Sequence, residues 1–209
     1  MSADATSAAA TSAGATSAGR TGAVVLAGGR SSRFGRDKLA ATIDGRPVLE
    51  HAIDAVRDVV DVVVVVLAPD DERPLPVGVE VARDLTAFEG PLAGLAAGLA
   101  ALPDDVDGAL VTGGDMPRMA VPVLALLLRT LAEDDAIDAV VLDEGGPLPM
   151  AIRRNRSRQL AEDLLAAGER RLRAVPESLG ATVIDGETWR ALDPVGTTLL
   201  DIDEPSDLP

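Results

Sequence analysis

Residues 24–38 decide the fold of this chain, and they read VVLAGGRSSRFGRDK. A short apolar run passes directly into two glycines, and basic side chains follow, among them Arg33 and Lys38. Glycine lets backbone N–H groups approach an anion closely, and basic side chains neutralise charge on its oxygens. Lys38 is also the only lysine in a chain whose net charge is -15. The segment therefore predicts a buried strand that ends in a phosphate-binding loop.

This loop matches neither of the common nucleotide fingerprints. In a P-loop the lysine follows glycine and precedes Ser or Thr, whereas Lys38 follows Asp37 and precedes Leu39. The spacing of Gly28, Gly29 and Gly35 does not fit the dinucleotide fingerprint either. The alternative is an ordinary strand-to-helix turn with incidental arginines. We favour an anion site because it explains the glycines and the cations together.

Composition excludes several classes of protein. The chain has no cysteine, so it forms no disulfide, thiolate metal site or cysteine nucleophile. A single histidine, His51, excludes a histidine cluster or a Ser-His-Asp triad, and we expect it at a surface or edge position. A sequence pI near 4.3 argues against a nucleic-acid or anionic-membrane surface. The acidity fits either a salt-adapted protein or simply an acidic cytoplasmic one.

Domain organisation is expected to be simple. Residues 1–20 are rich in Ala, Ser, Thr and Gly and lack the basic start and apolar stretch of a signal peptide, so we expect a disordered tail. The longest apolar runs fall short of the roughly 20 residues that a membrane span needs. Residues 21–209 are therefore expected to form one cytoplasmic domain.

Apolar runs and helical periodicities alternate along this domain. Such alternation predicts a three-layer α/β/α fold with a mainly parallel, Rossmann-like sheet. The expected strands are residues 22–26, 61–67, 79–82, 108–112, 136–142, 149–153, 181–184 and 197–202, and the expected helices are 48–60, 91–101, 121–132, 158–167 and 170–174.

Three chemically distinctive positions directly follow expected strands: the glycines of the loop, Asp84 and Asp115. Ligands of such sheets bind at the carboxyl ends of the strands, so these positions should share one rim. A carboxylate there can hold Mg²⁺ beside nucleotide phosphates. Asp115 stands too far before the next helix to cap it comfortably, whereas Asp84 taken alone is as readily a solvated turn residue.

The loop resembles the signature of the nucleotidyltransferases with a glycosyltransferase-A-like fold, and most closely that of the molybdenum cofactor guanylyltransferases. The resemblance covers nearly all of the chain after residue 20. It rests on LAGGxSxRFGxDK at residues 26–38, Asp84, GPLAG at 90–94, DMP at 115–117, GERR at 168–171 and DIDEPSDL at 201–208. Two glycines at 28 and 29 favour the guanylyl branch, because cytidylyl relatives usually carry Ala-Gly there.

The resemblance implies a transfer of GMP from Mg-GTP to molybdopterin-bound molybdenum cofactor, with release of pyrophosphate. It makes Arg33, Lys38 and Asp115 the catalytic residues and Asp115 the ligand of Mg²⁺, with Asp203 as a second candidate ligand. It also implies that the nucleotide is contacted by seven residues, namely Leu26, Ala27, Gly28, Gly29, Lys38, Asp84 and Asp115. It leaves open transient contact with enzymes that deliver or receive the cofactor, and it implies no nucleic acid or membrane partner.

Some readings stay open at this level. Asp201 and Asp203 suit either a metal site or a strand end followed by a helix cap. Seven arginines suit either a phosphorylated pterin or solvated helix ion pairs, namely Arg153, Arg154, Arg156, Arg158, Arg170, Arg171 and Arg173. Some family members carry a histidine before the proline of the middle strand, whereas this chain reads GPLP at 146–149. This difference weakens any residue-by-residue assignment of the family's pterin site to this chain.

The alternative functions are another nucleotidyltransferase of this fold and a non-catalytic nucleotide-binding partner in cofactor assembly. The nearer alternative is a cytidylyltransferase or a guanylyltransferase for a different phosphorylated acceptor. A non-catalytic partner would be expected to lose Lys38 or Asp115, and both are present.

Overall fold

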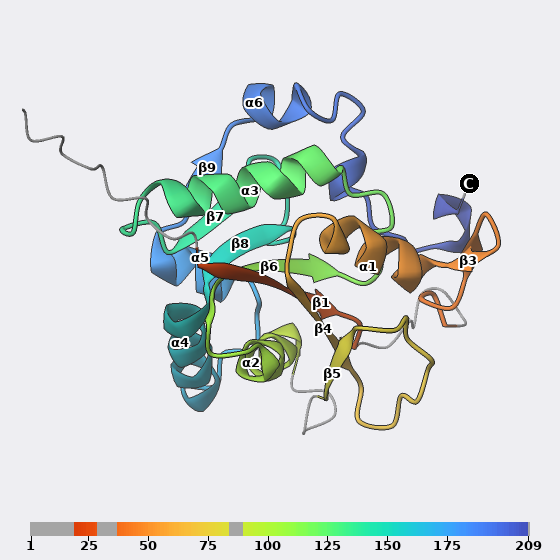
Figure 1. The fold of residues 1–209 in the computed structure, drawn as a ribbon, viewed down its shortest axis with the longest axis horizontal. Helices are drawn as coiled ribbons and strands as arrows, with labels where there is room; N and C mark the ends of the chain where they lie inside the picture. The colour runs from red at the N-terminus through yellow and green to blue at the C-terminus, as the bar shows by residue number, and fades with distance from the viewer. Residues whose placement is uncertain (1–18, 29–36, 84–89, 209) are drawn as a thin grey trace, which may run out of the picture.

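The computed structural model describes residues 19–28, 37–83 and 90–208. Its centre is a seven-stranded sheet in the order β5-β4-β1-β6-β8-β7-β9 (Figure 1). The strands are β1 (Arg20–Leu26), β4 (Val62–Leu67), β5 (Glu80–Arg83), β6 (Val106–Gly113), β7 (Ala139–Leu142), β8 (Met150–Arg153) and β9 (Thr182–Ile184), and a separate hairpin joins β2 (Thr42–Ile43) to β3 (Arg46–Pro47).

The sheet is mainly parallel, as the alternation of strand and helix predicts. Only β8 runs antiparallel, between β6 and β7. Helices cover both faces (Figure 1), which confirms the predicted α/β class. The helices are α1 (Val48–Arg57), α2 (Pro91–Ala101), α3 (Val121–Glu133), α4 (Arg154–Ala166), α5 (Ala174–Leu179) and α6 (Gly186–Arg190).

Aliphatic side chains build a core on each face of the sheet. Along β4, Val63 and Val65 point into the core that α1 and α3 cover, whereas Val64 and Val66 point into the core beneath α2, α4 and α5. All four are at most 4% exposed. Strands buried on both faces must be apolar at every position, which explains why β4 reads as five consecutive valines before Leu67.

The register of the central strands brings the predicted loop and the predicted carboxylate together. β1 pairs in parallel with β6, and Leu26 at the end of β1 lies opposite Gly113 at the end of β6. The segments after the two strands, which begin with Ala27 and Gly114, therefore leave the sheet side by side. The backbone N–H of Gly114 donates to the carbonyl of Leu26 at 2.9 Å.

Two predicted elements are wrong. Residues 170–174 are not a helix, because the Glu169 carboxylate accepts hydrogen bonds from the backbone N–H groups of Arg170 and Arg171 and fixes a turn. Helix α5 begins only at Ala174.

The second error is the strand expected at 197–202, where the chain forms a 3-10 turn at Thr197–Leu199. Here Gly196 adopts a φ of 76°, and the Asp193 carboxylate holds the backbone of Thr198. Pattern reasoning also missed the β2–β3 hairpin and α6, which are short.

The remaining predicted elements are present, with ends shifted by up to four residues. Residues 1–18 of the predicted tail lie outside the described residues, whereas its last residue, Arg20, is the first residue of β1. Within the described part of the chain, no helix has the length and apolar character that a bilayer crossing requires.

The close packing of α2 on the sheet predicts opposite effects for two glycines of that helix. A Cβ at Gly98 would lie 2.4 Å from Cγ1 of Val24 and 2.9 Å from Cγ2 of Val66. Gly98→Ala should therefore destabilise the protein by about 1–3 kcal/mol. At Gly94 the nearest atoms are 3.6 Å away, so Gly94→Ala should be neutral or stabilising by up to ~1 kcal/mol through helix propensity. Urea unfolding of both variants measures the difference, and equal effects would contradict this packing.

Candidate functional site

Lys38 lies between two carboxylates that are far apart in the sequence. Its Nζ is 2.6 Å from Oδ2 of Asp115 and 2.9 Å from Oδ1 of Asp203. The Lys38 side chain is 18% exposed, compared with 24% for Asp115 and 46% for Asp203. The only lysine of the chain thus joins the predicted loop, the end of β6 and the C-terminal segment at one point.

The turn that carries Lys38 is fixed by its neighbours. Leu39 is buried in the core beside α1, and its backbone N–H donates to the Asp37 carboxylate at 3.0 Å. Asp37 is in turn paired with Arg73 at 3.1 Å, and Arg73 also pairs with Asp71. The loop is therefore anchored on both sides of Lys38, by an apolar side chain and by ion pairs.

Glycine at the end of β6 allows the Asp115 side chain to adopt its position. A Cβ on residue 113 would lie 2.3 Å from Oδ1 of Asp115 and 3.2 Å from Cγ of Met116. Any side chain there would push the Asp115 carboxylate away from Lys38. A Cβ on Gly114 would similarly meet Leu49 at 2.9 Å. The two glycines before Asp115 thus meet a packing requirement of the site.

The C-terminal segment is hydrogen-bonded to the backbone of Asp115. The N–H of Ile202 donates to the Asp115 carbonyl at 2.9 Å, and the Ile202 side chain is buried beside Val48. This one anchor places Asp201 and Asp203 on either side of a fixed residue. The predicted metal candidates Asp115 and Asp203 therefore come together, and Asp201 comes with them.

A buried network that the sequence analysis did not identify holds this segment. The Thr198 hydroxyl donates to the Asp193 carboxylate at 2.7 Å and accepts from the backbone N–H of Ala120 at 3.0 Å. Asp193 also accepts from the N–H groups of Gly196 and Thr198. The network ties the C-terminal segment to the loop after Asp115. The sequence Asp-Pro-Val-Gly at 193–196 is a turn signal that could have indicated it.

Three carboxylates gather in this site around one ammonium group. Asp115, Asp201 and Asp203 each offer an oxygen, and these oxygens lie within 4.8 Å of one another. Burial and the neighbouring carboxylates of Asp203 and Asp115 raise the pKa of Asp201. Burial lowers the pKa of Lys38, but its hydrogen bonds to Asp115 and Asp203 outweigh this effect and leave that pKa raised. Lys38 is therefore charged at neutral pH, and among the described residues its ammonium group lies beside the three acidic groups.

The donor set suits a hard divalent cation. Carboxylate oxygens are the ligands that Mg²⁺ prefers, and Mg²⁺ usually takes one or two of them beside water and substrate phosphates. The observed cluster offers three carboxylate oxygens, which is enough for one or two such ligands, at the rim where β1 ends. The residues present therefore fit the predicted metal.

The other predicted site residues are only partly described. Leu26, Ala27 and Gly28 lie at the end of β1 as expected, next to the end of β4, where the Ala27 N–H donates to the Val66 carbonyl. Gly29, Arg33 and Asp84 lie outside the described residues.

Six of the seven clustered arginines have structural partners. Arg154 is 2% exposed and donates to the carbonyls of Leu99 and Leu102. Arg171 pairs with Glu169 and, together with two backbone N–H groups, lowers the pKa of that carboxyl to about 2. Similar partners hold the remaining four, which are Arg153 with Asp107, Arg156 with Asp138, Arg158 with Glu162 and Arg170 with the carbonyl of Leu165.

Comparison with known proteins gives a consistent result. Residues 23–183 match the family model described as a MobA-like NTP transferase domain. A probable molybdenum cofactor guanylyltransferase of Chloroflexus aggregans is 31% identical over 191 residues, which cover 88% of this chain and 90% of the relative. The Mycobacterium marinum protein of the same description is 32% identical over 189 residues, 89% of this chain and 90% of the relative.

A solved structure supports the fold. The crystal structure of molybdopterin-guanine dinucleotide biosynthesis protein A from Archaeoglobus fulgidus superposes with a TM-score of 0.70 at 23% identity, over 90% of this chain and 94% of that one. At this level of identity the match shows a shared fold.

The Asp193 network predicts a pH-dependent contribution to stability. Burial would raise the pKa of Asp193, but hydrogen bonds from Thr198 and Thr197 outweigh it and hold that pKa below its ordinary value. A lowered pKa stabilises the folded state above the unfolded value of about 3.9, and this contribution is lost as pH falls through the folded pKa. Asp193→Asn should therefore cost about 1–3 kcal/mol at pH 7.

The loss should shrink as pH is lowered below about 4, because the wild-type carboxylate then becomes protonated as well. Urea unfolding over a pH series measures this. Asp58→Asn is the control, because Asp58 is an exposed residue at the end of α1. An equal loss at every pH would contradict the assigned role of the ionised carboxylate.

Proposed function

Since this chain belongs to the MobA-like NTP transferase family, we propose that it transfers GMP from GTP to the phosphate of molybdopterin-bound molybdenum cofactor, releasing pyrophosphate. The names of its relatives support the guanylyl donor and the acceptor. One structural observation carries the proposal: Lys38 and the carboxylates of Asp115 and Asp203 meet at the rim where β1 enters the glycine-rich loop. We propose the cytoplasm as its location, because GTP is a cytoplasmic nucleotide.

We assign the metal to Asp115, with Asp203 as the second ligand. Mg²⁺ bound there would neutralise phosphate charge and align the triphosphate. Lys38 contacts one oxygen of each carboxylate, so a divalent cation bound to these two groups would share them with Lys38 or displace it. The ammonium group would then be available to the phosphates that the cation brings. This differs from the simpler expectation that Lys38 serves phosphate alone.

The reaction needs alignment more than proton transfer. An oxygen of the acceptor phosphate attacks the α-phosphorus of GTP, and the bond between that phosphorus and the bridging oxygen to the β-phosphate breaks. The acceptor is already an anion, so no general base is required. We assign Arg33 and Lys38 to neutralising the charge of the leaving pyrophosphate. We assign Asp84 and the backbone of Leu26–Gly29 to binding the nucleoside.

Gly28 supports the choice of guanine as the base. A Cβ on this residue would lie 3.7 Å from the nearest atom, the backbone nitrogen of Ala68, which is ordinary contact. The packing of the protein therefore does not demand glycine at this position. Close approach of a purine ring to the backbone gives a reason for it.

Donor selectivity tests the proposed reaction. The purified protein is incubated with Mg²⁺, molybdopterin or molybdenum cofactor, and each of the four nucleoside triphosphates, and the dinucleotide and pyrophosphate are quantified. GTP should be preferred over CTP and ATP at least tenfold, about 1.4 kcal/mol in transition-state binding. Equal use of CTP would favour a cytidylyltransferase. Transfer only to another phosphorylated acceptor would overturn the assigned acceptor, and no transfer at all would favour a non-catalytic role.

Substitution of the two aspartates tests the metal assignment. Asp115→Asn keeps the shape of the side chain and removes its charge, so it should lower Mg²⁺-dependent turnover by about 10²–10³. GTP binding without metal should survive, because one source of repulsion is gone. Asp203→Asn should be milder, since Asp203 is more exposed and the amide keeps an oxygen ligand.

Turnover as a function of Mg²⁺ concentration, together with Mn²⁺ binding followed by electron paramagnetic resonance, separates the two roles. If Asp203→Asn were inactive and Asp115→Asn active, the assignment would be inverted.

A further inference from the structure

The turn that follows β4, residues 68–73, lies against the glycine-rich loop at both of the loop's described ends. At the first end, a Cβ on Gly28 would lie 3.7 Å from the backbone nitrogen of Ala68. At the second end, the guanidinium of Arg73 lies 3.1 Å from Oδ2 of Asp37. We call this segment the β4 turn. It is the part of the structure against which the two ends of the loop rest.

The sheet fixes the β4 turn through its main chain. Nη1 of Arg83, on the edge strand β5, donates to the carbonyls of Ala68, Pro69 and Asp71 at 3.1, 3.2 and 2.7 Å. The backbone N–H of Asp71 also donates to the Ala68 carbonyl at 3.1 Å. These bonds satisfy carbonyls that no ladder of the sheet uses, and they hold the turn in one shape at the end of β4.

Arg73 joins the carboxylates of Asp71 and Asp37. Its Nη2 lies 2.5 Å from Oδ2 of Asp71 and 3.1 Å from Oδ2 of Asp37, and its Nε donates to Asp71 at 2.7 Å. The Arg73 and Asp71 side chains are 19% and 16% exposed, compared with 48% for Asp37. Burial would raise the pKa of Asp71, but hydrogen bonds from Arg73 outweigh it and leave that pKa lowered. The shielded pair with Asp71 thus places the guanidinium beside Asp37.

Asp37 connects this bridge to Lys38, the next residue. Its Oδ1 accepts from the backbone N–H of Leu39 at 3.0 Å, so the carboxylate spans Lys38 along the chain. The Leu39 side chain is buried in the core beside α1. A fixed Asp37 carboxylate therefore fixes the direction in which the Lys38 side chain leaves the backbone, and Nζ reaches Asp115 at 2.6 Å.

We propose that Arg73 is a positioning residue for the bound triphosphate, which acts through Asp37 on the segment that carries Lys38. The inference rests on the proposed function, in which Lys38 serves the phosphates of GTP. Arginine suits this role because its planar fork binds two carboxylates in a fixed geometry, whereas a lysine ammonium is a single point charge. Arg73 also neutralises Asp37, a carboxylate that would otherwise repel a triphosphate beside it.

Five variants separate positioning from support of the fold. Arg73→Met removes the charged fork and keeps the aliphatic stem, and Arg73→Lys keeps the charge without the fork. Asp71→Asn takes the charge from the other half of the bridge and leaves Asp37 paired. Asp37→Asn removes the ion pair and keeps an oxygen acceptor. Arg20→Met is the control, because Arg20 pairs with Asp105 at the opposite end of β1 from the loop.

Calorimetric binding of Mg-GTP without acceptor is the first measurement, and melting temperatures verify that each variant is folded. Arg73→Met should raise the dissociation constant about tenfold. Arg73→Lys should raise it less, Asp71→Asn by less than about threefold, and Arg20→Met not at all. In the Asp37→Asn background, Arg73→Met should have little further effect, because both substitutions act on one pair. In turnover, Arg73→Met should raise KM for GTP and leave KM for the acceptor unchanged.

Two results of this binding experiment overturn the proposal. A full tenfold loss on Arg73→Met in the Asp37→Asn background would show that Arg73 does not act through Asp37. Equal losses in Arg73→Met and Asp71→Asn would show that the bridge only supports the fold.

The single lysine allows a second measurement that needs no nucleotide. Protein labelled with lysine carrying carbon-13 at Cε gives one lysine signal in its NMR spectrum, that of Lys38. In the nucleotide-free protein, Arg73→Met should shift or broaden this signal, and Arg20→Met should leave it unchanged. An unchanged signal in folded Arg73→Met overturns the proposal. If the wild type binds no GTP while the Lys38 signal still responds to Arg73→Met, the proposed function is contradicted and the positioning of Lys38 is supported.

Discussion

The site of this protein depends on the ion pairs that Lys38 makes with Asp115 and Asp203. These residues come from the loop after β1, the end of β6 and the C-terminal segment. Asp115 follows Lys38 by 77 positions and Asp203 follows it by 165, so one ammonium group joins distant parts of the chain. Like-charged carboxylates this close would repel one another without a cation between them. In the proposed function, the same carboxylates and ammonium group would bind a divalent ion and the triphosphate.

Small residues and short hydrogen-bonded turns make this arrangement possible. Gly113 leaves room for the Asp115 carboxylate, and the Ile202 backbone fixes the C-terminal segment against Asp115. The buried Asp193–Thr198 pair prevents that segment from extending as a strand. The groups that position the site are therefore different from those that would perform the chemistry. Reading only the charged residues of the motifs would miss them.

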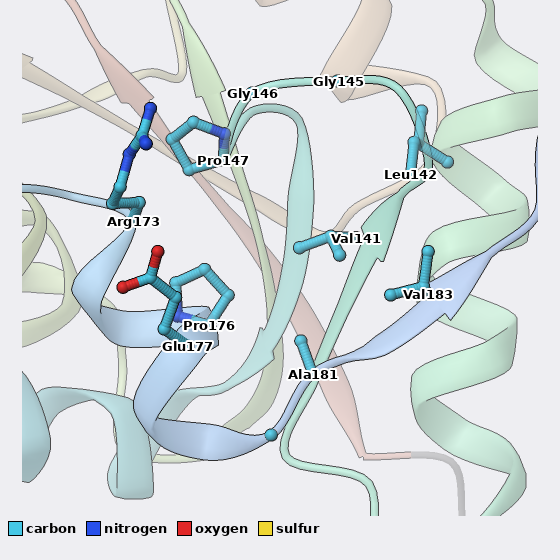
Figure 2. Close-up of a pocket in the computed structure, with 11 residues that line it drawn as sticks. Val141, Leu142, Gly145, Gly146, Pro147, Arg173, Pro176, Glu177, Ala181 and Val183 are labelled. Carbon is cyan, nitrogen blue, oxygen red and sulfur yellow. The ribbon is translucent and has the colours of Figure 1, made fainter.

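The arginines show how tertiary structure separates binding groups from structural ones. Their number near residues 153–173 suggests an anion site, yet buried carbonyls, carboxylates and helix neighbours occupy six of the seven side chains. Arg173 instead lines a pocket between β7, β9 and α5 (Figure 2). A sequence lists charges, but their availability depends on which partners the fold brings within reach.

The sequence by itself determined the α/β class, most strand and helix positions and the loop that carries Lys38. It did so because buried parallel strands must be continuously apolar. Glycines followed by a single lysine after such a strand also favour an anion-binding loop over other local structures. Only the tertiary structure decided which carboxylates meet Lys38, that residues 197–202 form a turn, and that Arg173 lines a pocket. These features depend on contacts between segments far apart in the chain, and local periodicity carries no information about such contacts.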